Sequence, residues 1–282
     1  RGSLSMLIDS RERHVVDWIH EIIVVLVPAF SQTSSYSHGD SRRLPLLFVN
    51  SPGPGVNRAR NYGGELAQSA SIAFLDDDVE LESPHFFEET ARLFRRPTVV
   101  AVGGDYGTAD GTDLWGRGYN ALCSLWRASA GQGSAVMLLG GFMVVRHDAW
   151  TAAGGFDDNI VYGGSEAGLI CDLRSAHGEV VYSPRMRVTH RTHGRGLGRW
   201  LWVAFRQGCA KKQTSSQLPT FWRRLTLTVE AMGQLPLKDV RAFFFFTPLF
   251  LLSSRCGSLC AALKLVPSAW SRPKRARVHS DY

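Results

Sequence analysis

The sequence has 282 residues, of which 44% are hydrophobic, 20% charged and 11% aromatic, which is enough for one large domain or a domain with a smaller appendage. This composition excludes a mainly disordered chain, a collagen and a coiled coil. The five cysteines form no dense framework, so a disulfide scaffold is not expected and a reducing compartment is favoured. The net charge of +7 points to an anionic partner: a nucleotide, a phospholipid surface or a nucleic acid.

The first part of the chain predicts strands around one helix. Leu4–Ile8 is an apolar run suited to a buried strand. Apolar residues at helical spacing then predict a helix from His14 that ends before Pro28. Within that helix, the run EIIVVLV over residues 21–27 can also be read as a strand. Leu44–Val49 follows as another strand after a polar loop.

Helices and strands then alternate through the middle of the chain. The predicted elements are a helix over Asn57–Gln68, a strand over Ile72–Leu75, a helix from Pro84 to Phe94, and strands over Val99–Gly103, Gly140–Arg146 and Val180–Tyr182. Apolar strands separated by helices are typical of an α/β fold whose sheet is mainly parallel and flanked by helices.

The end of the chain changes to helical segments that mix basic and aromatic residues. Its most apolar stretch is Ala242–Leu252, and an extension to Leu263 takes in Arg255, which makes it a poor candidate for a membrane-spanning helix. Two interpretations stay open: a helix lying on an anionic membrane surface, or a helical cap packed over the sheet. We therefore divide the chain into residues 1–198 and a C-terminal helical extension over 199–282.

Three consecutive carboxylates, Asp76, Asp77 and Asp78, directly follow the buried strand Ile72–Leu75. In open α/β sheets, ligands gather at the carboxyl ends of the strands. Clustered carboxylates repel one another, and Mg²⁺ or Mn²⁺ relieves that repulsion, especially when substrate phosphates complete the ligand shell. The alternative is a solvated acidic turn. His190 follows a later strand, where an imidazole could join such a metal, although structural histidines are the commoner case.

Three further features could contribute to the same site. A Gly/Pro turn over residues 52–55 opens a helix carrying Arg58 and Arg60, which suits a phosphate-bearing ligand but also describes many surface turns. The pair Gly140–Gly141 permits close approach of a ligand, or simply a tight turn. Glu166 lies near a helix start, where the helix dipole stabilises a carboxylate, so it is either a reactive group or a capping residue.

Four stretches, taken in order, resemble the family 2 glycosyltransferases with a GT-A fold. They are PGPGVNRARNYG, IAFLDDDVEL, LLGGFMVVRHDAWTAAGGFDD and YGGSEAGLICDLRSAHGEVVYSPRMRVTH, and they run from Pro52 to His190, roughly half of the chain. One such motif would be weak evidence, whereas four in order are specific. The resemblance implies a GT-A (Rossmann-like) fold. It also implies inverting transfer of a sugar from a nucleotide-diphosphate donor to an acceptor hydroxyl, assisted by a divalent cation.

The resemblance implies roles for individual residues. Asp76 and Asp78 match the ends of the family's D-x-D motif, so Asp78 would hold the cation (Mn²⁺ or Mg²⁺) and Asp76 would face the nucleotide sugar and share the cation. Glu166 falls where the family keeps its catalytic base, and His190 matches a histidine that reaches the metal or the diphosphate in some members. The other implied contacts are to the donor, at Asp9, Arg58, Arg60, Asn61 and Asp77, and to the acceptor or sugar, at Gly140, Gly141 and Ser165.

The sequence departs from the family at two places. The family's usual Glu-Asp pair reads Ser165-Glu166 here, and Gly168 stands where an acidic residue is common. The first part of the chain lacks the acidic residue that usually reads the nucleotide base, which leaves Asp9 as the candidate and the donor unidentified. A GT-A domain that binds a nucleotide or a glycan without turnover is therefore the alternative function.

The expected partners are a nucleotide-diphosphate sugar and a glycan, lipid-linked or small-molecule acceptor. The expected location is cytoplasmic, with a peripheral contact at the inner face of the membrane left open. No nucleic-acid partner is expected, because the basic run RPKRAR over 272–277 comes without any nucleic-acid-binding module. A zinc site built from His190, His193, Cys256 and Cys260 is rejected, because their spacing forms no standard finger.

Overall fold

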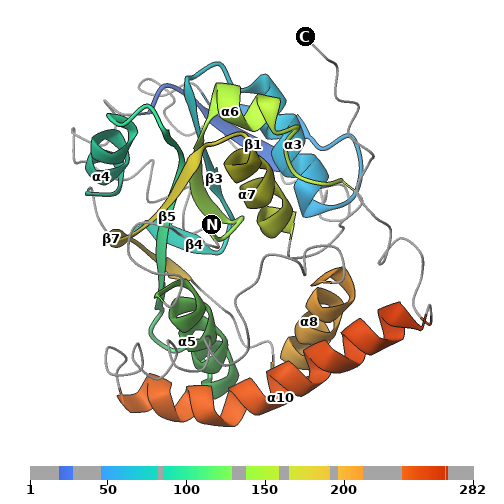
Figure 1. Ribbon diagram of the computed structural model, residues 1–282. Coiled ribbons are helices and arrows are strands. Elements are labelled where there is room, and N and C mark those ends of the chain that lie inside the picture. The colour runs from blue at the N-terminus through green and yellow to red at the C-terminus, as the bar shows by residue number, and fades with distance from the viewer. Residues whose placement is uncertain are drawn as a thin grey trace.

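The computed structural model describes residues 19–27, 46–81, 85–128, 138–158, 165–190, 196–211, 237–263 and 265. Its strands are β1 (Ile22–Leu26), β2 (Leu46–Asn50), β3 (Ser71–Leu75), β4 (Val79–Leu81), β5 (Val99–Thr108), β6 (Phe142–Arg146) and β7 (Glu179–His190). Its helices are α3 (Val56–Leu66), α4 (His85–Phe94), α5 (Leu114–Ala128), α6 (His147–Ala152), α7 (Ser165–Ser175), α8 (Gly196–Lys211) and α10 (Leu237–Ala262). Figure 1 shows their arrangement.

The strands form two sheets. β1 and β2 pair in parallel, and the other five strands form one sheet in the order β3-β6-β5-β7-β4. In that sheet β5 and β7 are parallel, whereas the pairs β3–β6, β5–β6 and β4–β7 are antiparallel. The expected α/β class is confirmed, but the expectation of a mainly parallel sheet is wrong. The apolar pattern of a buried strand does not record its direction, which depends on how the chain connects the strands.

Helices cover both faces of the five-stranded sheet (Figure 1). On one face, Ile72 and Phe74 of β3 pack with Trp150 of α6 and Leu169 of α7. On the other face, α4 packs through Phe86, which is 1% exposed. Complete burial of each such side chain contributes about 2 kcal/mol by the area it removes from water. We call the two sheets with α3, α4, α6 and α7 the α/β body.

α5, α8 and α10 lie together below the α/β body in Figure 1, and we call them the helical layer. Phe250 of α10 is fully buried there, in one apolar cluster with Trp200 of α8 and Leu122 of α5. α8 and α10 approach closely, since an ideal Cβ on Gly208 would lie 1.9 Å from the carbonyl oxygen of Ser254. Only glycine fits at that contact, so this sequence position fixes how the two helices pack.

Two parts of the chain differ from the expected elements. Ile22–Leu26 is a strand and not the end of a helix, as the alternative interpretation allowed, because its run of β-branched residues favours extended backbone. Leu4–Ile8 and Asp9 lie outside the described residues. No element was expected where α5 lies, and α5 packs mostly against α10. The proposed boundary at residue 198 falls near the start of α8. It therefore places α5 on one side of the boundary and most of α8 and all of α10, with which α5 packs, on the other.

Candidate active site

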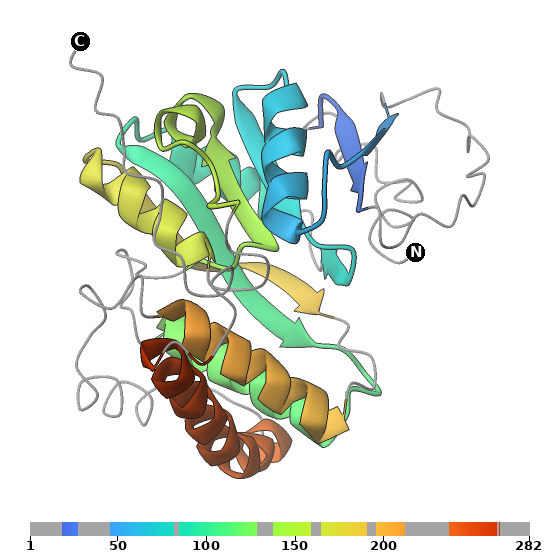
Figure 2. The same ribbon diagram turned by 90° about the vertical axis from the view of Figure 1, so that its right-hand side faces the viewer.

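One edge of the five-stranded sheet gathers the predicted residues. β3, β5 and β7 run in the same direction, because β6 is antiparallel to both β3 and β5, and β5 is parallel to β7. Their carboxyl ends therefore meet at one edge, where β6 begins. Asp76–Asp78 follow β3, Gly140–Gly141 precede β6, and His190 ends β7. In Figure 2, β5 and β7 end toward the helical layer.

Asp78 and His190 face each other at this edge. Val79 pairs with His190 in the β4–β7 ladder, and this register brings Oδ2 of Asp78 to 3.3 Å from the imidazole Nε2. The other ring nitrogen, Nδ1, lies 3.2 Å from the amide Oδ1 of Asn120 in α5. Tyr106 stacks on the ring, with 4.8 Å between centroids.

The Asn120 contact determines what Nε2 can do. An amide oxygen only accepts hydrogen bonds, so this contact requires a hydrogen on Nδ1 of His190, and in a neutral ring Nε2 then keeps the lone pair. That lone pair and the carboxylate of Asp78 are then two acceptors at 3.3 Å from each other. A cation or a second proton between them removes their repulsion.

Asp76 has a different partner. Nη2 of Arg60 in α3 donates to Oδ1 of Asp76 over 2.6 Å, and the N–H of Asp76 donates to the carbonyl of Gly141 over 3.0 Å. The Arg60 side chain is only 13% exposed. Burial lowers the pKa of this guanidinium, but the charge and hydrogen bond of Asp76 and the charges of Glu166 and Tyr106 raise it by more, so the net shift is upward. Arg60 therefore stays charged beside Asp76.

The expected metal ligands are thus divided between two contacts. Asp78 faces His190, whereas Asp76 is paired with Arg60. Within the described parts of the chain, no group of three or more His, Cys, Asp or Glu side chains lies close enough to hold a metal ion. The structure does not bring Asp76 to the other two as a third ligand, because Arg60 holds its carboxylate.

The glycine pair lies between these groups. An ideal Cβ on Gly141 would lie 2.0 Å from Oδ2 of Asp76, and one on Gly140 would lie 2.7 Å from Nη1 of Arg60. The Cβ of Glu166, in the first turn of α7, would be 3.5 Å from that same Gly140 Cβ. Glycine at both positions is what lets Asp76, Arg60 and Glu166 come together.

Arg58 and Asn61 are engaged with the loop that follows α6. The amide of Asn61 donates to the carbonyl of Phe156 (2.8 Å) and to Oδ1 of Asp158 (2.7 Å), and it accepts from the N–H of Phe156 (2.8 Å). Nε of Arg58 lies 3.9 Å from Oδ2 of Asp158. The Phe156 ring in turn lies 5.4 Å from the guanidinium of Arg60. Asn61 therefore has a structural role, bracing the loop beside Arg60, that sequence reasoning missed.

The structure shows less about the remaining predicted site residues. Asp77 is exposed, Ser165 begins α7 although its side chain lies outside the described part, and Asp9 is not described at all. Sequence reasoning also missed Asn120 and Tyr106, which hold the His190 ring. The signal for Asn120 is a polar residue inside the apolar helical run YNALC, because a polar side chain buried there needs a hydrogen-bond partner.

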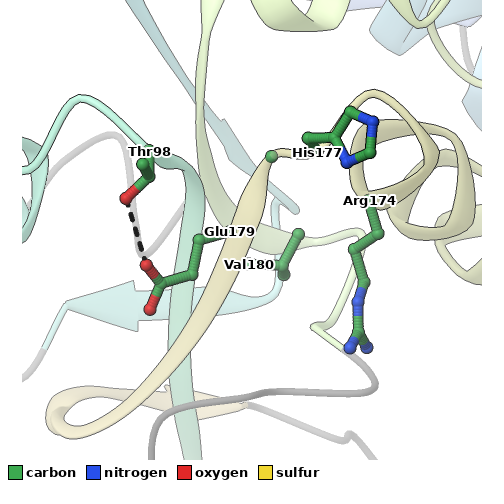
Figure 3. Close-up of a pocket in the computed structure, with 6 residues that line it drawn as sticks. Thr98, Arg174, His177, Glu179 and Val180 are labelled. Atoms are coloured by element: carbon green, nitrogen blue, oxygen red, sulfur yellow. Dashed lines mark hydrogen bonds between the residues drawn. The ribbon is translucent and has the colours of Figure 1, made fainter.

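A separate hollow lies at the opposite edge of the sheet, where β5 and β7 begin (Figure 3). It is lined by Thr98, Arg174, His177, Gly178, Glu179 and Val180. Within it, Oγ1 of Thr98 donates to the carboxylate of Glu179 over 3.2 Å. None of the expected site residues lines this hollow, so we place the site at the edge that holds Asp78 and His190.

Comparison of the sequence with known families supports the resemblance. Residues 35–152 match the sequence model of the family described as glycosyl transferase family 2. The matched stretch includes Asp76–Asp78 and Gly140–Gly141, and it ends before Glu166 and His190. No curated protein sequence matches the chain.

Two solved structures are similar in fold. The mannosyltransferase PcManGT from Pyrobaculum calidifontis, in complex with GDP-Man and Mn²⁺, is 15% identical with a TM-score of 0.59, over 85% of this chain and 77% of that one. The crystal structure of GalNAc-T7 with UDP, GalNAc and Mn²⁺ is 14% identical with a TM-score of 0.50, over 87% of this chain and 52% of that one. At these identities the likeness concerns the fold alone. The chain therefore has the fold of these glycosyltransferases, and its residues 35–152 match glycosyl transferase family 2.

Proposed function

We propose that this glycosyltransferase moves a sugar, with inversion, from a nucleotide-diphosphate donor to an acceptor hydroxyl, assisted by Mn²⁺ or Mg²⁺. The observation that carries the proposal is the meeting of Asp78 and His190 at the same sheet edge as Gly140–Gly141 and Glu166. The similar solved structures support the choice of donor and cation, because they contain GDP-Man or UDP together with Mn²⁺.

The residues present suit such a cation. Asp78 and His190 offer one oxygen and one nitrogen donor 3.3 Å apart, and the carboxylate is of the kind that suits Mg²⁺ or Mn²⁺. Substrate phosphates commonly complete a shell that the protein leaves unfinished. When bound, the cation would neutralise charge on the departing diphosphate. Asn120 would fix the His190 ring in the orientation that keeps Nε2 free for it.

Arg60 and Asp76 are assigned to the donor. Arg60 occupies Oδ1 of Asp76, and Oδ2 lies against Gly141, in the position that a side chain there would take. A hydroxyl of the ribose or of the sugar can donate to that second oxygen. The hydrogen bond from Arg60 holds the Asp76 carboxylate in place while the donor binds.

Glu166 is the proposed base. It lies in the first turn of α7, where the helix dipole favours the carboxylate, and the Arg60 cation favours it too. As the acceptor oxygen attacks the anomeric carbon, its proton passes to Glu166, and the bond from that carbon to the diphosphate oxygen breaks on the opposite side. A base in this position accelerates transfer by about 10²–10⁴-fold.

The first test concerns donor binding. UDP, GDP and dTDP are titrated into the full chain by calorimetry, with and without Mn²⁺, and we expect one of them to bind in a metal-dependent way. Asp78→Asn should remove the metal-dependent part. Asp148→Asn is the matched control, because Asp148 is an exposed carboxylate in α6 at the opposite sheet edge. Nucleotide binding that Asp78→Asn leaves unchanged would overturn the metal assignment.

The second test separates binding from chemistry. Release of the nucleoside diphosphate from the matching nucleotide sugar is measured in the parent protein and in Glu166→Gln. We expect the variant to keep donor binding and to lose about 10²-fold or more in turnover. Unchanged turnover in this variant would remove Glu166 as the base. Binding without any turnover in the parent protein would instead favour the non-catalytic alternative.

A further inference from the structure

The positive charge of the chain is concentrated in its C-terminal part. Residues 199–282 contain 14 of the 32 Lys and Arg residues but only 3 of the 25 Asp and Glu residues, a net charge of +11. Residues 1–198 have a net charge of −4. The catalytic residues therefore lie in an acidic part of the chain, and α8 and α10 lie in a strongly basic part.

α10 carries apolar side chains on two opposite sides. One side is buried against α5 and α8 through Phe246 and Phe250. On the other side Phe245 is 68% exposed and Leu252 is 65% exposed. The exposed large apolar residues of the helix are Leu237, Phe244, Phe245, Leu249, Leu251, Leu252 and Leu259, and Leu263 follows its end. Soluble proteins rarely expose a continuous apolar stripe of this length, so we expect a binding partner to bury this outer face of α10.

Basic and aromatic residues accompany the outer face. Arg241 and Arg255 are exposed on α10 itself. Trp202 on the neighbouring helix α8 is 48% exposed and stacks on Phe205, with 5.6 Å between ring centroids. An apolar helix face that carries arginines, together with an exposed tryptophan on a neighbouring helix, is typical of segments that lie in a membrane interface.

The packing of α10 argues for a helix that lies along the membrane surface. By length and composition alone, Asp239–Ala262 could cross a bilayer. However, Asp239 near its start is 3.3 Å from Arg117 of α5, and its backbone at Ser254 touches Gly208 of α8. α10 is thus attached along its length to α5 and α8, whose described 15 and 16 residues are shorter than the about 20 that a bilayer needs. A transverse orientation of α10 would break these contacts.

We propose that the outer face of α10 binds the surface of an anionic phospholipid membrane, with the helix parallel to that surface. The exposed Phe and Leu side chains enter the acyl boundary, while Arg241 and Arg255 stay at the level of the phosphates. Charge decides against a second copy of this chain as that partner, because two regions of +11 repel each other and attract anionic lipid. This inference does not rest on the transfer reaction, so either proposal can fail while the other stands.

The experiment measures partition of the full chain between buffer and vesicles by flotation. The vesicles contain phosphatidylcholine alone or phosphatidylcholine with phosphatidylglycerol. The apolar variant is Phe245→Ser with Leu252→Ser, and its control is Leu47→Ser, which removes an exposed leucine from β2. The charge variant is Arg241→Gln with Arg255→Gln, and its control is Arg95→Gln, an exposed arginine that follows α4.

We expect the parent chain to bind the anionic vesicles and to bind the neutral ones far more weakly. The apolar variant should lose more than about tenfold in partition. The charge variant should lose roughly 30-fold at low salt, since each surface arginine contributes about fivefold. Both controls should bind like the parent. Because all changed residues are exposed, near-UV circular dichroism should show an unchanged fold.

Two results would overturn the proposal. One is a correctly folded parent chain that does not bind anionic vesicles, or that binds neutral and anionic vesicles equally. The other is a concentration-dependent dimer in analytical ultracentrifugation that the apolar variant dissociates, which would make a second copy the partner.

Discussion

The α/β body and the helical layer differ in which of their features indicate a function. In the body, Asp76–Asp78, Gly140–Gly141 and His190 lie at the ends of strands, and the sheet brings them to one edge. The helical layer contains no sequence motif that indicates a function. Its role is indicated instead by the distribution of charge along the chain and by the exposed apolar residues on the outer face of α10. The difference teaches that chemistry can be read from residue order, whereas attachment to a surface becomes visible only when the faces of the helices are known.

The largest expected effect tests whether the two regions are one folding unit. Phe250→Ala in the layer and Phe86→Ala in the body should each lower the free energy of unfolding by about 3–5 kcal/mol, because both side chains are fully buried. Chemical denaturation should show one transition that shifts in both variants, since Asn120 of α5 contacts His190 of the sheet. Phe244→Ala, on the exposed side of α10, is the control and should change the free energy by less than about 0.5 kcal/mol. Two separate transitions would show that the regions fold independently.

A second prediction concerns the body alone. Gly141→Ala would place a Cβ 2.0 Å from Oδ2 of Asp76 and force that carboxylate to move. We expect turnover to fall by about 100-fold while the fold persists, since a displacement of about 1 Å at a reacting group has this effect. The control is Gly198→Ala in α8, where nothing lies within 4 Å of the added Cβ. Normal turnover in Gly141→Ala would mean that Asp76 is not held where donor binding needs it.

A third prediction joins the two regions. Asn120→Ala removes the acceptor that fixes the His190 ring, and we expect Mn²⁺ affinity in the presence of nucleotide to fall by 10–100-fold, the usual range for such supporting contacts. Calorimetry would measure it, with nucleotide affinity in the absence of metal as the internal control. An equal loss with and without metal would mean that the substitution disturbs the fold and not the ring orientation.

The smallest expected effect depends on pH. Hydrogen bonds from Arg92 lower the pKa of the Glu89 carboxyl below its ordinary value of 4.5; burial opposes this, and a hydrogen bond from Ser183 adds to it. A lowered pKa in the folded state means that the stabilisation is present above pH 4.5 and is lost as the pH falls through the folded value. Glu89→Gln should therefore cost about 1–2 kcal/mol at neutral pH and less in acid. Glu88→Gln, exposed on the same helix, is the control and should change the free energy of unfolding at neutral pH by less than about 0.5 kcal/mol.

Most of the sheet and the position of the site could be predicted from the sequence. An apolar strand followed by Asp76–Asp78 places those carboxylates at a sheet edge whatever the strand's direction. The pairing of Asp76 with Arg60 could not be predicted, because it depends on α3 lying beside the glycine pair. The antiparallel pairs and helix α5 were missed for a related reason, and strand β1 was only one of two interpretations of residues 21–27. The local sequence pattern only partly determines whether a segment is a helix or a strand. It does not show which other element that segment packs against.

The position of α5 limits how the molecule can be divided. It leaves the body after β5, and its inner side, which includes Leu122, is covered by Phe246 and Phe250 of α10. A fragment ending at residue 198 would keep every proposed catalytic residue and still lose the cover of α5. We expect such a fragment to aggregate. Residues 1–198 are therefore not expected to be exchangeable between proteins as a separate module, and any recombination of this chain with another has to carry α5 together with α8 and α10.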